Sequence, residues 1–103
     1  MAYRIYYFTI MQFAWDENKN RENIKKYKVS FEEAKFVFFD ENAKIIHDPD
    51  HSSTEDRFII LGLSNLLKLL VVCHCYRESD DIVRIISARK ASRKESLKYG
   101  ERK

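Results

Sequence analysis

The chain has 103 residues, of which 45% are hydrophobic and 14% aromatic, and its formal net charge is +3. This length suits one domain with one core, and the apolar content excludes an intrinsically disordered chain. The longest apolar run, 58–76, is interrupted by small and polar residues, so it predicts two strands and not a membrane span. The N-terminus lacks the features of a signal peptide, and we expect a cytoplasmic protein.

Residues 1–12 are the first segment, and their aromatic, β-prone stretch predicts either an N-terminal extension or an edge strand. A single domain over 13–103 follows, because the rest of the chain has no repeat, no low-complexity segment and no linker. Asp16 predicts the N-cap of a helix that ends near Tyr27, since its carboxylate can accept hydrogen bonds from the free first-turn amides.

A second helix and a series of strands come next. Ser30 and Glu33 have the spacing of a capping box, which predicts a helix from about Phe31 to Phe38. The hydrophobic period then changes to two, and this predicts strands over 43–47, 57–63, 66–76 and 82–87. Their connectors are short and polar, as in an antiparallel meander.

The last predicted element is a basic helix over about 91–99. The resulting fold class is α+β, an antiparallel sheet with two N-terminal helices and a basic C-terminal helix, with the helices packed over one face of the sheet.

Positive charge is concentrated in residues 82–103. This segment has eight Lys or Arg against Glu95 and Glu101, a net charge of +6, whereas the other residues, 11 basic and 14 acidic, sum to −3. A cationic end on a small domain indicates a polyanion partner, and RNA or DNA phosphate is the first candidate. The helix cations that we expect to hold RNA backbone are Lys90, Arg93 and Lys94.

Several side chains near the predicted end of the sheet suit metal-free RNA cleavage. In that reaction a base takes the 2′-hydroxyl proton, arginines stabilise the charged pentavalent phosphate, and an acid protonates the leaving 5′-oxygen. Alternation along the strands leaves open whether Arg57 and His74 meet. The candidate catalytic residues are Glu55, Arg57, His74, Arg84, Arg89 and Tyr99.

Some of these residues also have a structural interpretation. His74, in an apolar strand, fits a half-buried and hydrogen-bonded histidine. Arg57 fits a surface pair with Glu55 or Asp56, and Tyr99 fits an anchor that holds the last helix to the core.

Two patterns of metal-ligating residues do not, in our interpretation, predict a metal site. The loop 47–51 has two histidines and two aspartates, but Asp48 and Pro49 start a turn whose oxygens can satisfy loop amides. In the triplet 73–75 the histidine faces away from the two cysteines, and a disulfide between these cysteines would be strained. We expect reduced thiols, no metal and no cofactor. A small metal-binding protein that uses the loop 47–51 is a third functional interpretation.

Six segments, taken together and in order, resemble the BrnT family over residues 13 to 99. They are 13–19 (FAWDENK), 23–27 (NIKKY), 29–34 (VSFEEA), 48–51 (DPDH), 55–59 (EDRFI) and 84–91 (RIISARKA).

BrnT proteins are ribonuclease toxins of type II toxin–antitoxin systems with a RelE-like fold. The resemblance therefore implies a compact sheet flanked by helices and a ribonuclease that inhibits translation. It also implies a partner, the antitoxin BrnA, whose ribbon-helix-helix part binds DNA; promoter DNA is bound only through the toxin–antitoxin complex. By likeness, activity is carried onto Arg57, Arg84, Arg89 and Tyr99, and His74 stands where the family often has a histidine.

The chain departs from the family pattern at the end of the first helix. Lys26-Tyr27-Lys28 stands where members commonly have Lys-His-Gly. If a left-handed residue is needed there, Lys28 adopts it at a cost of roughly 1 kcal/mol relative to glycine. A role for a histidine at that turn does not transfer to this chain.

The sequence thus predicts a metal-independent endoribonuclease toxin. The alternative is a non-catalytic nucleic-acid-binding or regulatory module, such as a degenerate toxin.

Overall fold

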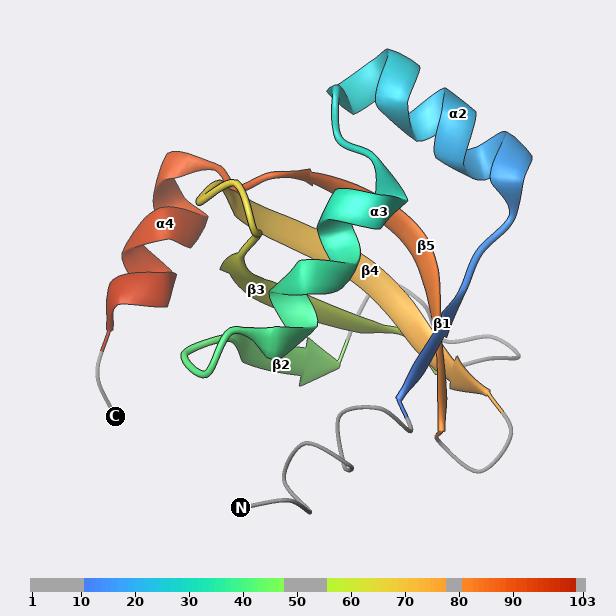
Figure 1. Cartoon of the computed structure of the whole chain (residues 1–103). Helices are drawn as coiled ribbons and strands as arrows, with labels where there is room; N and C mark the ends of the chain where they lie inside the picture. The colour runs from blue at the N-terminus through green and yellow to red at the C-terminus, as the bar shows by residue number, and fades with distance from the viewer. Residues whose placement is uncertain (1–10, 48–55, 78–80, 102–103) are drawn as a thin grey trace.

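The computed structural model of the chain describes residues 11–47, 56–77 and 81–101, and Figure 1 traces the others in grey. The described residues form a mixed α+β fold, as predicted, with one five-stranded sheet. None of their helices is long and apolar enough to cross a membrane. In chain order the elements are β1 (Gln12–Ala14), α2 (Glu17–Tyr27), α3 (Phe31–Ala34), the 3-10 helix η1 (Lys35–Phe39), β2 (Lys44–His47), β3 (Phe58–Leu63), β4 (Leu69–Arg77), β5 (Ile82–Lys90) and α4 (Arg93–Gly100).

The sheet has the strand order β1-β5-β4-β3-β2. From β2 to β5 each strand is antiparallel to the next, which confirms the predicted meander. At the other edge β1 runs parallel to β5, with Ala14 opposite Arg84, so the prediction of a wholly antiparallel sheet is wrong there. A parallel pair needs a long crossover, and the helices and strands between β1 and β5 supply it.

The predicted N-terminal extension, 1–12, overlaps the start of this edge strand. Residues 1–10 lie outside the described part of the chain, whereas Gln12 already pairs with Ile82 of β5. The described edge strand therefore begins one residue before the boundary that the sequence indicated for the domain.

Local capping determines where the N-terminal helices begin and end. Asp16 Oδ1 accepts hydrogen bonds from the amides of Asn18 and Lys19, at 2.8 and 3.3 Å, and so caps α2 as predicted. Lys28 ends the helix in the left-handed region, with φ 62°, which confirms that this lysine takes the position commonly held by glycine.

The second predicted helix is shorter and tighter than expected. Ser30 Oγ accepts from the Glu33 amide at 3.0 Å and caps α3, but the chain narrows into the 3-10 helix η1 after Ala34. The capping box is only half formed, because the Glu33 carboxylate accepts a hydrogen bond from Ser64 Oγ at 2.7 Å instead of turning back to the cap.

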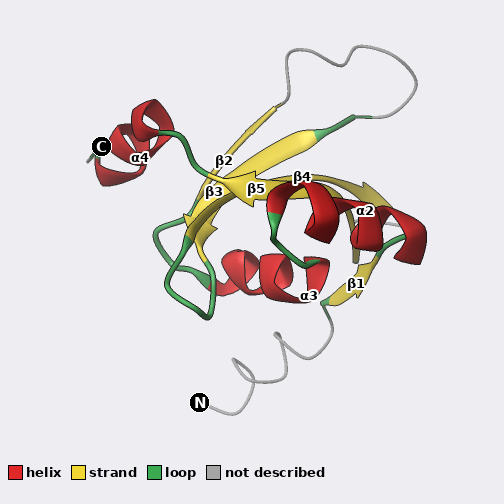
Figure 2. Ribbon diagram, turned by 90° about the horizontal axis from the view of Figure 1, so that it is seen from above, coloured by secondary structure: helices red, strands yellow, loops and turns green. Residues whose placement is uncertain are grey.

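The core lies between α3, η1 and one face of the sheet. Phe31, Ala34 and Val37 are fully buried against Val72 and Ile85 of the central strands. Figure 2 shows α3 beneath the sheet and α4 away from α2 and α3. The helix α4 instead lines a groove with Ile59, Leu61 and Val71, which lie on the sheet face opposite the core. The expectation that all helices pack over one face is therefore wrong for α4.

Candidate functional site

The strand β5 has two distinct faces. Its residues Val83, Ile85 and Ala88 are each 1% exposed and belong to the core. Arg84, Ser87 and Arg89 are only half-buried. Their Cα partners on β4 are Cys75, Cys73 and Val71, which alternate regularly along that strand. We call the sheet face that carries these residues, opposite the core, the open face.

A β-bulge is the reason why Arg84 and Arg89 share the open face. Two residues five apart in a regular strand point to opposite faces. The register between β4 and β5 shifts between Cys73 and His74, which pair with Ser87 and Ile85, so Ile86 is the additional residue. The bulge reverses the alternation once and returns Arg89 to the face of Arg84.

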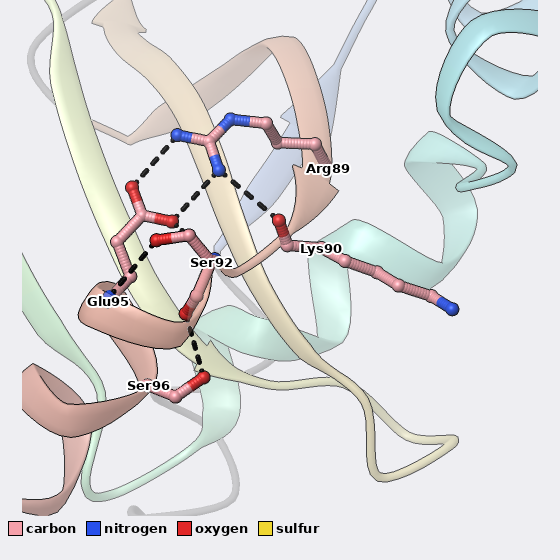
Figure 3. A network of polar contacts seen from close by, with 5 residues as sticks. All are labelled: Arg89, Lys90, Ser92, Glu95 and Ser96. Atoms are coloured by element: carbon pink, nitrogen blue, oxygen red, sulfur yellow. Dashed lines mark hydrogen bonds and ion pairs between the residues drawn. The ribbon is translucent and has the colours of Figure 1, made fainter.

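Arg89 is held in an ion pair at one end of the open face. Its Nη1 and Nη2 donate to Oε1 and Oε2 of Glu95, each at 2.9 Å, and Nη1 also donates to the Lys90 carbonyl at 3.2 Å. Glu95 in turn accepts from the Ser92 amide at 2.7 Å and completes the capping box of α4 (Figure 3). The hydrogen bonds from Arg89 are the main reason that the pKa of Glu95 falls to about 2.

The position of Arg89 is also fixed from α2. Asn23, which is 6% exposed, donates from Nδ2 to the Ala88 carbonyl at 2.8 Å and accepts from the Ala88 amide at 3.1 Å. β1 covers the outer edge of β5 only from Ile82 to Arg84. The Asn23 amide therefore pairs with β5 at Ala88 in the manner of a neighbouring strand.

Arg84 lies at the other end of the open face, in a different setting. It lines a hollow together with Trp15 and Arg77. No ion pair or side-chain hydrogen bond joins Arg84 or Arg77 to another residue in the described ranges. Arg84 is half-buried. Because it has no ion pair with a described carboxylate, its positive charge is not neutralised at this end of the open face.

Arg57 immediately precedes β3 and is half-buried. In the sheet Phe58 pairs with His74, and His74 with Ile85. Extending this register by one residue sets Arg57 level with Arg84, about 10 Å away across two strand spacings. The structure thus brings Arg57 to the Arg84 end of the sheet and not to the Arg89 end.

His74 is not on the open face. Its side chain is fully buried, with its ring centroid 4.8 Å from that of Phe38, 6.1 Å from that of Phe58 and 5.2 Å from that of Tyr76. Burial lowers its pKa to about 4, so the imidazole is neutral at pH 7. The predicted convergence of His74 with the arginines is therefore not found, because alternation turns His74 toward the core.

Tyr99 anchors α4 to the rest of the fold. Its hydroxyl donates to Asp40 Oδ2 at 2.7 Å, and the same oxygen accepts from the Leu63 amide at 2.8 Å. Burial, which is the larger cause, and the hydrogen bond to Asp40, which is the next, raise the pKa of Tyr99 to about 12. This phenol is therefore a weaker acid than an ordinary tyrosine. Lys44 Nζ also donates hydrogen bonds to the carbonyls of Lys98 and Glu101, at 2.6 and 2.8 Å.

The remaining predicted residues are cations of the strand–helix junction and residues outside the described ranges. Lys90, Arg93 and Lys94 are all exposed, at the end of β5 and in the first turn of α4. Glu55 and the loop 48–51 lie outside the described residues. Within the described ranges no group of three or more His, Cys, Asp or Glu could hold a metal ion.

The sequence patterns did not identify Trp15 and Arg77 as residues that line the hollow beside Arg84. A signal was present for both, because Trp15 stands in the first segment of the family resemblance and Arg77 directly follows the predicted strand 66–76. Only the parallel pairing of β1 with β5, however, shows that they meet Arg84.

Comparison with known proteins identifies relatives of the chain. A family model described as ribonuclease toxin, BrnT, of type II toxin–antitoxin system matches residues 15–95. Among solved structures, the 1.1 Å crystal structure of the ribonuclease toxin BrnT from Brucella abortus is similar, with 27% sequence identity and a TM-score of 0.61. That match covers 81% of this chain and 99% of the Brucella chain. No curated protein matches the chain.

Proposed function

The chain belongs to the BrnT family of ribonuclease toxins of type II toxin–antitoxin systems, and we propose that it is an endoribonuclease that cleaves RNA without a metal ion. In this proposal it acts on RNA in the cytoplasm and thereby inhibits translation. The observation that carries the proposal is the open face, on which Arg84 and Arg89 lie along one strand that leads into the exposed cations of α4. The mixed α+β sheet also supports a RelE-like arrangement.

The chemistry that fits this face is an attack by the 2′-oxygen of a ribose on the adjacent phosphorus. The bond from phosphorus to the 5′-oxygen breaks, and the products are a 2′,3′-cyclic phosphate and a 5′-hydroxyl. Arginines lower the barrier because they stabilise the extra negative charge of the pentavalent phosphate. Arg84 is the described residue best suited to this role, since no described carboxylate neutralises it.

In our proposal the two ends of the open face bind different phosphates of the RNA. Opposite β4, Arg84 and Arg89 are four residues apart, from Cys75 to Val71, a separation of about 13 Å. The two Cα positions are too far apart for a single phosphate to be bound at both. The two long arginine side chains can instead bind different phosphates of one RNA strand. We propose that Arg84 and Arg57 bind the scissile phosphate and that Arg89 binds a neighbouring one.

Acid–base catalysis then depends on the residues before β3. His74 is fully buried, and Tyr99 is hydrogen-bonded to Asp40. We propose structural roles for both and keep Glu55, two residues before Arg57, as the candidate base. A carboxylate with an ordinary pKa is ionised at pH 7 and can accept the 2′-hydroxyl proton.

An antitoxin is the partner that family membership implies. We propose a BrnA-like protein whose ribbon-helix-helix part binds promoter DNA in the toxin–antitoxin complex. Expression of the chain alone should then arrest growth, and co-expression with a neighbouring ribbon-helix-helix reading frame should restore it. Growth arrest that the neighbouring protein does not relieve would contradict this assignment.

The direct test of the activity is cleavage of total RNA by purified protein in excess EDTA. Arg84→Ala and Arg89→Ala are compared with Arg21→Ala, which removes the same charge from the exposed face of α2. We expect EDTA-resistant cleavage that both open-face variants reduce and the α2 variant leaves unchanged. Cleavage that is equal in all three variants would locate the activity elsewhere or assign it to a contaminant.

A non-catalytic RNA-binding module is the second candidate, and one observation favours it. Glu95, the described carboxylate that contacts Arg89 on the open face, is held in an ion pair by that arginine and is not available as a base. The same assay distinguishes the two functions. Salt-sensitive RNA binding without cleavage by the unmodified protein would support the module and overturn the endoribonuclease.

A further inference from the structure

The hollow at the β1 end of the open face has the composition of a nucleotide site. It has a volume of about 370 Å³ and opens between the end of β1, the start of α2 and the adjoining ends of β4 and β5. Its lining combines one large aromatic ring, two guanidinium groups and one aliphatic wall, with a single carboxylate. The lining residues are Ala14, Trp15, Asp16, Arg77, Ile82 and Arg84.

Trp15 is held firmly by its neighbours. It follows directly on Ala14, which pairs with Arg84, and its ring packs edge-on to Phe31 with centroids 6.0 Å apart and an interplanar angle of 79°. Its Nε1 donates to Glu17 Oε2 at 3.4 Å. The side chain is only half-buried, so an indole fixed in position remains partly exposed in the hollow.

The charge of the hollow is positive. Arg77 pairs with Ile82, and Ile82 is two residues from Arg84 on the same face of β5, so the register brings the two guanidinium groups to one rim. Neither arginine has a side-chain partner among the described residues. The one carboxylate, Asp16, already accepts hydrogen bonds from two amides of the first turn of α2.

We propose that this hollow is a subsite for one nucleotide of single-stranded RNA, with the base stacked on Trp15 and the flanking phosphates bound by Arg77 and Arg84. An aromatic face beside cations is how proteins bind single strands without reading their sequence. The proposal deepens the proposed function, on which it rests, because it fixes where the substrate enters. RNA held at this end runs along β5 toward Arg89, about 13 Å further on.

The subsite also predicts the form of the substrate. A base can stack on Trp15 only when it is not paired in a duplex, so the enzyme should require an unpaired nucleotide beside the scissile bond. Double-stranded RNA of the same sequence should be bound more weakly than the single strand.

Trp15 is the single tryptophan of the chain, which makes the test direct. A hexanucleotide with 2′-O-methyl riboses has no 2′-hydroxyl proton, so it binds without being cleaved. We expect its titration into the full-length protein to quench tryptophan emission by at least half at saturation. Unchanged emission at saturation, with binding established by anisotropy of a labelled hexanucleotide, would overturn the subsite.

Variants separate stacking from charge. By anisotropy, Trp15→Leu should weaken binding of the hexanucleotide about 10-fold and Arg77→Ala about 5-fold, whereas Arg21→Ala should change it less than 2-fold. Trp15→Tyr keeps an aromatic face and should stay within about 3-fold of the unmodified protein, which covers the case that Trp15→Leu does not fold. An affinity of Arg77→Ala, or of a folded Trp15→Leu, equal to that of the unmodified protein would overturn the proposal.

Two controls isolate this inference. A poly-glutamate peptide of the same charge should not quench Trp15, and equal quenching would overturn the nucleotide assignment in favour of an acidic peptide. Cleavage of total RNA without quenching by the hexanucleotide would leave the proposed ribonuclease intact and refute the subsite. Quenching without cleavage would refute the ribonuclease and leave the subsite standing.

Discussion

Each end of β5 carries an arginine on the open face, but the two arginines differ in whether a described carboxylate neutralises them. At one end Arg89 is bonded by both terminal nitrogens to Glu95, and the pair joins the strand to the cap of α4. At the other end Arg84 has no carboxylate partner among the described residues. An arginine on an exposed sheet face can therefore either be fixed in position by a carboxylate partner or remain available to an anion.

The largest expected effect distinguishes these two arginines. Arg84→Ala should reduce the cleavage rate by about 100-fold to 1,000-fold, because removal of one donor to a transition-state oxyanion has that size. Arg89→Ala should reduce the cleavage rate only about 10-fold, since Glu95 already neutralises most of the charge that this substitution removes. Single-turnover cleavage of a short RNA gives both numbers. A larger loss in Arg89→Ala would reverse the comparison.

Replacement of His74 tests whether the core face takes part in catalysis. His74→Phe keeps an aromatic ring among Phe38, Phe58 and Tyr76, and cleavage should stay within about 3-fold. A loss of 100-fold in a variant with unchanged circular dichroism would return His74 to the catalytic group.

The same residue predicts a pH dependence of stability. The pKa of His74 is about 4 in the folded protein and 6.5 in its unfolded reference, so the unfolded chain takes up a proton first as the pH falls. Stability is therefore retained above pH 6.5 and lost between 6.5 and about 4, by on the order of 3 kcal/mol in total. Urea unfolding at several pH values should show this loss, and His74→Phe should reduce it. An equal loss in the variant would assign it to other groups.

Glu95→Gln should leave Arg89, like Arg84, without a carboxylate partner among the described residues. Loss of the carboxylate charge leaves Arg89 available to phosphate, so RNA affinity should rise about 3-fold to 10-fold and the salt dependence should steepen by about one phosphate contact. Glu32→Gln, which breaks an exposed pair with Lys35, is the matched control and should have no effect. Unchanged affinity in Glu95→Gln would mean that Arg89 does not contact RNA.

The smallest expected effect concerns the anchor of α4. Tyr99→Phe removes the hydrogen bond to Asp40 and should lower the free energy of unfolding by about 1 kcal/mol, while cleavage stays within 2-fold. Tyr27→Phe, at a position that is 37% exposed, provides the control for the loss of a hydroxyl. Abolished cleavage in Tyr99→Phe, with the fold intact, would contradict a purely structural role.

Local features of the fold could be predicted from the sequence. The caps formed by Asp16 and Ser30 and the left-handed Lys28 depend on contacts within a few residues, and all three are found. The capping box of Ser92 and Glu95 is equally local and has the Ser-x-x-Glu pattern in the sequence. Our prediction for this segment was a basic helix without a stated cap, so this cap is a feature that the sequence contains and the prediction lacked.

The arrangement of the open face could not be predicted in the same way. The bulge at Ile86, which returns Arg89 to the face of Arg84, results from the pairing of β4 with β5 and cannot be located from the sequence of either strand alone. The hollow depends on β1 lying parallel to β5, which joins Trp15 to residues more than sixty positions later in the chain. Resemblance to BrnT indicated Arg84 and Arg89 as candidate site residues, but it did not indicate that one has a carboxylate partner and the other has none among the described residues.

One measurement tests directly whether RNA binds the open face of β5. Backbone amide shifts of ¹⁵N-labelled protein are followed by NMR during titration with the 2′-O-methyl hexanucleotide. The account predicts that the largest changes fall on Arg84, Ser87 and Arg89 and on the Trp15 indole N–H, with small changes on α2. Changes concentrated on the basic residues of α2, with β5 unaffected, would contradict the account.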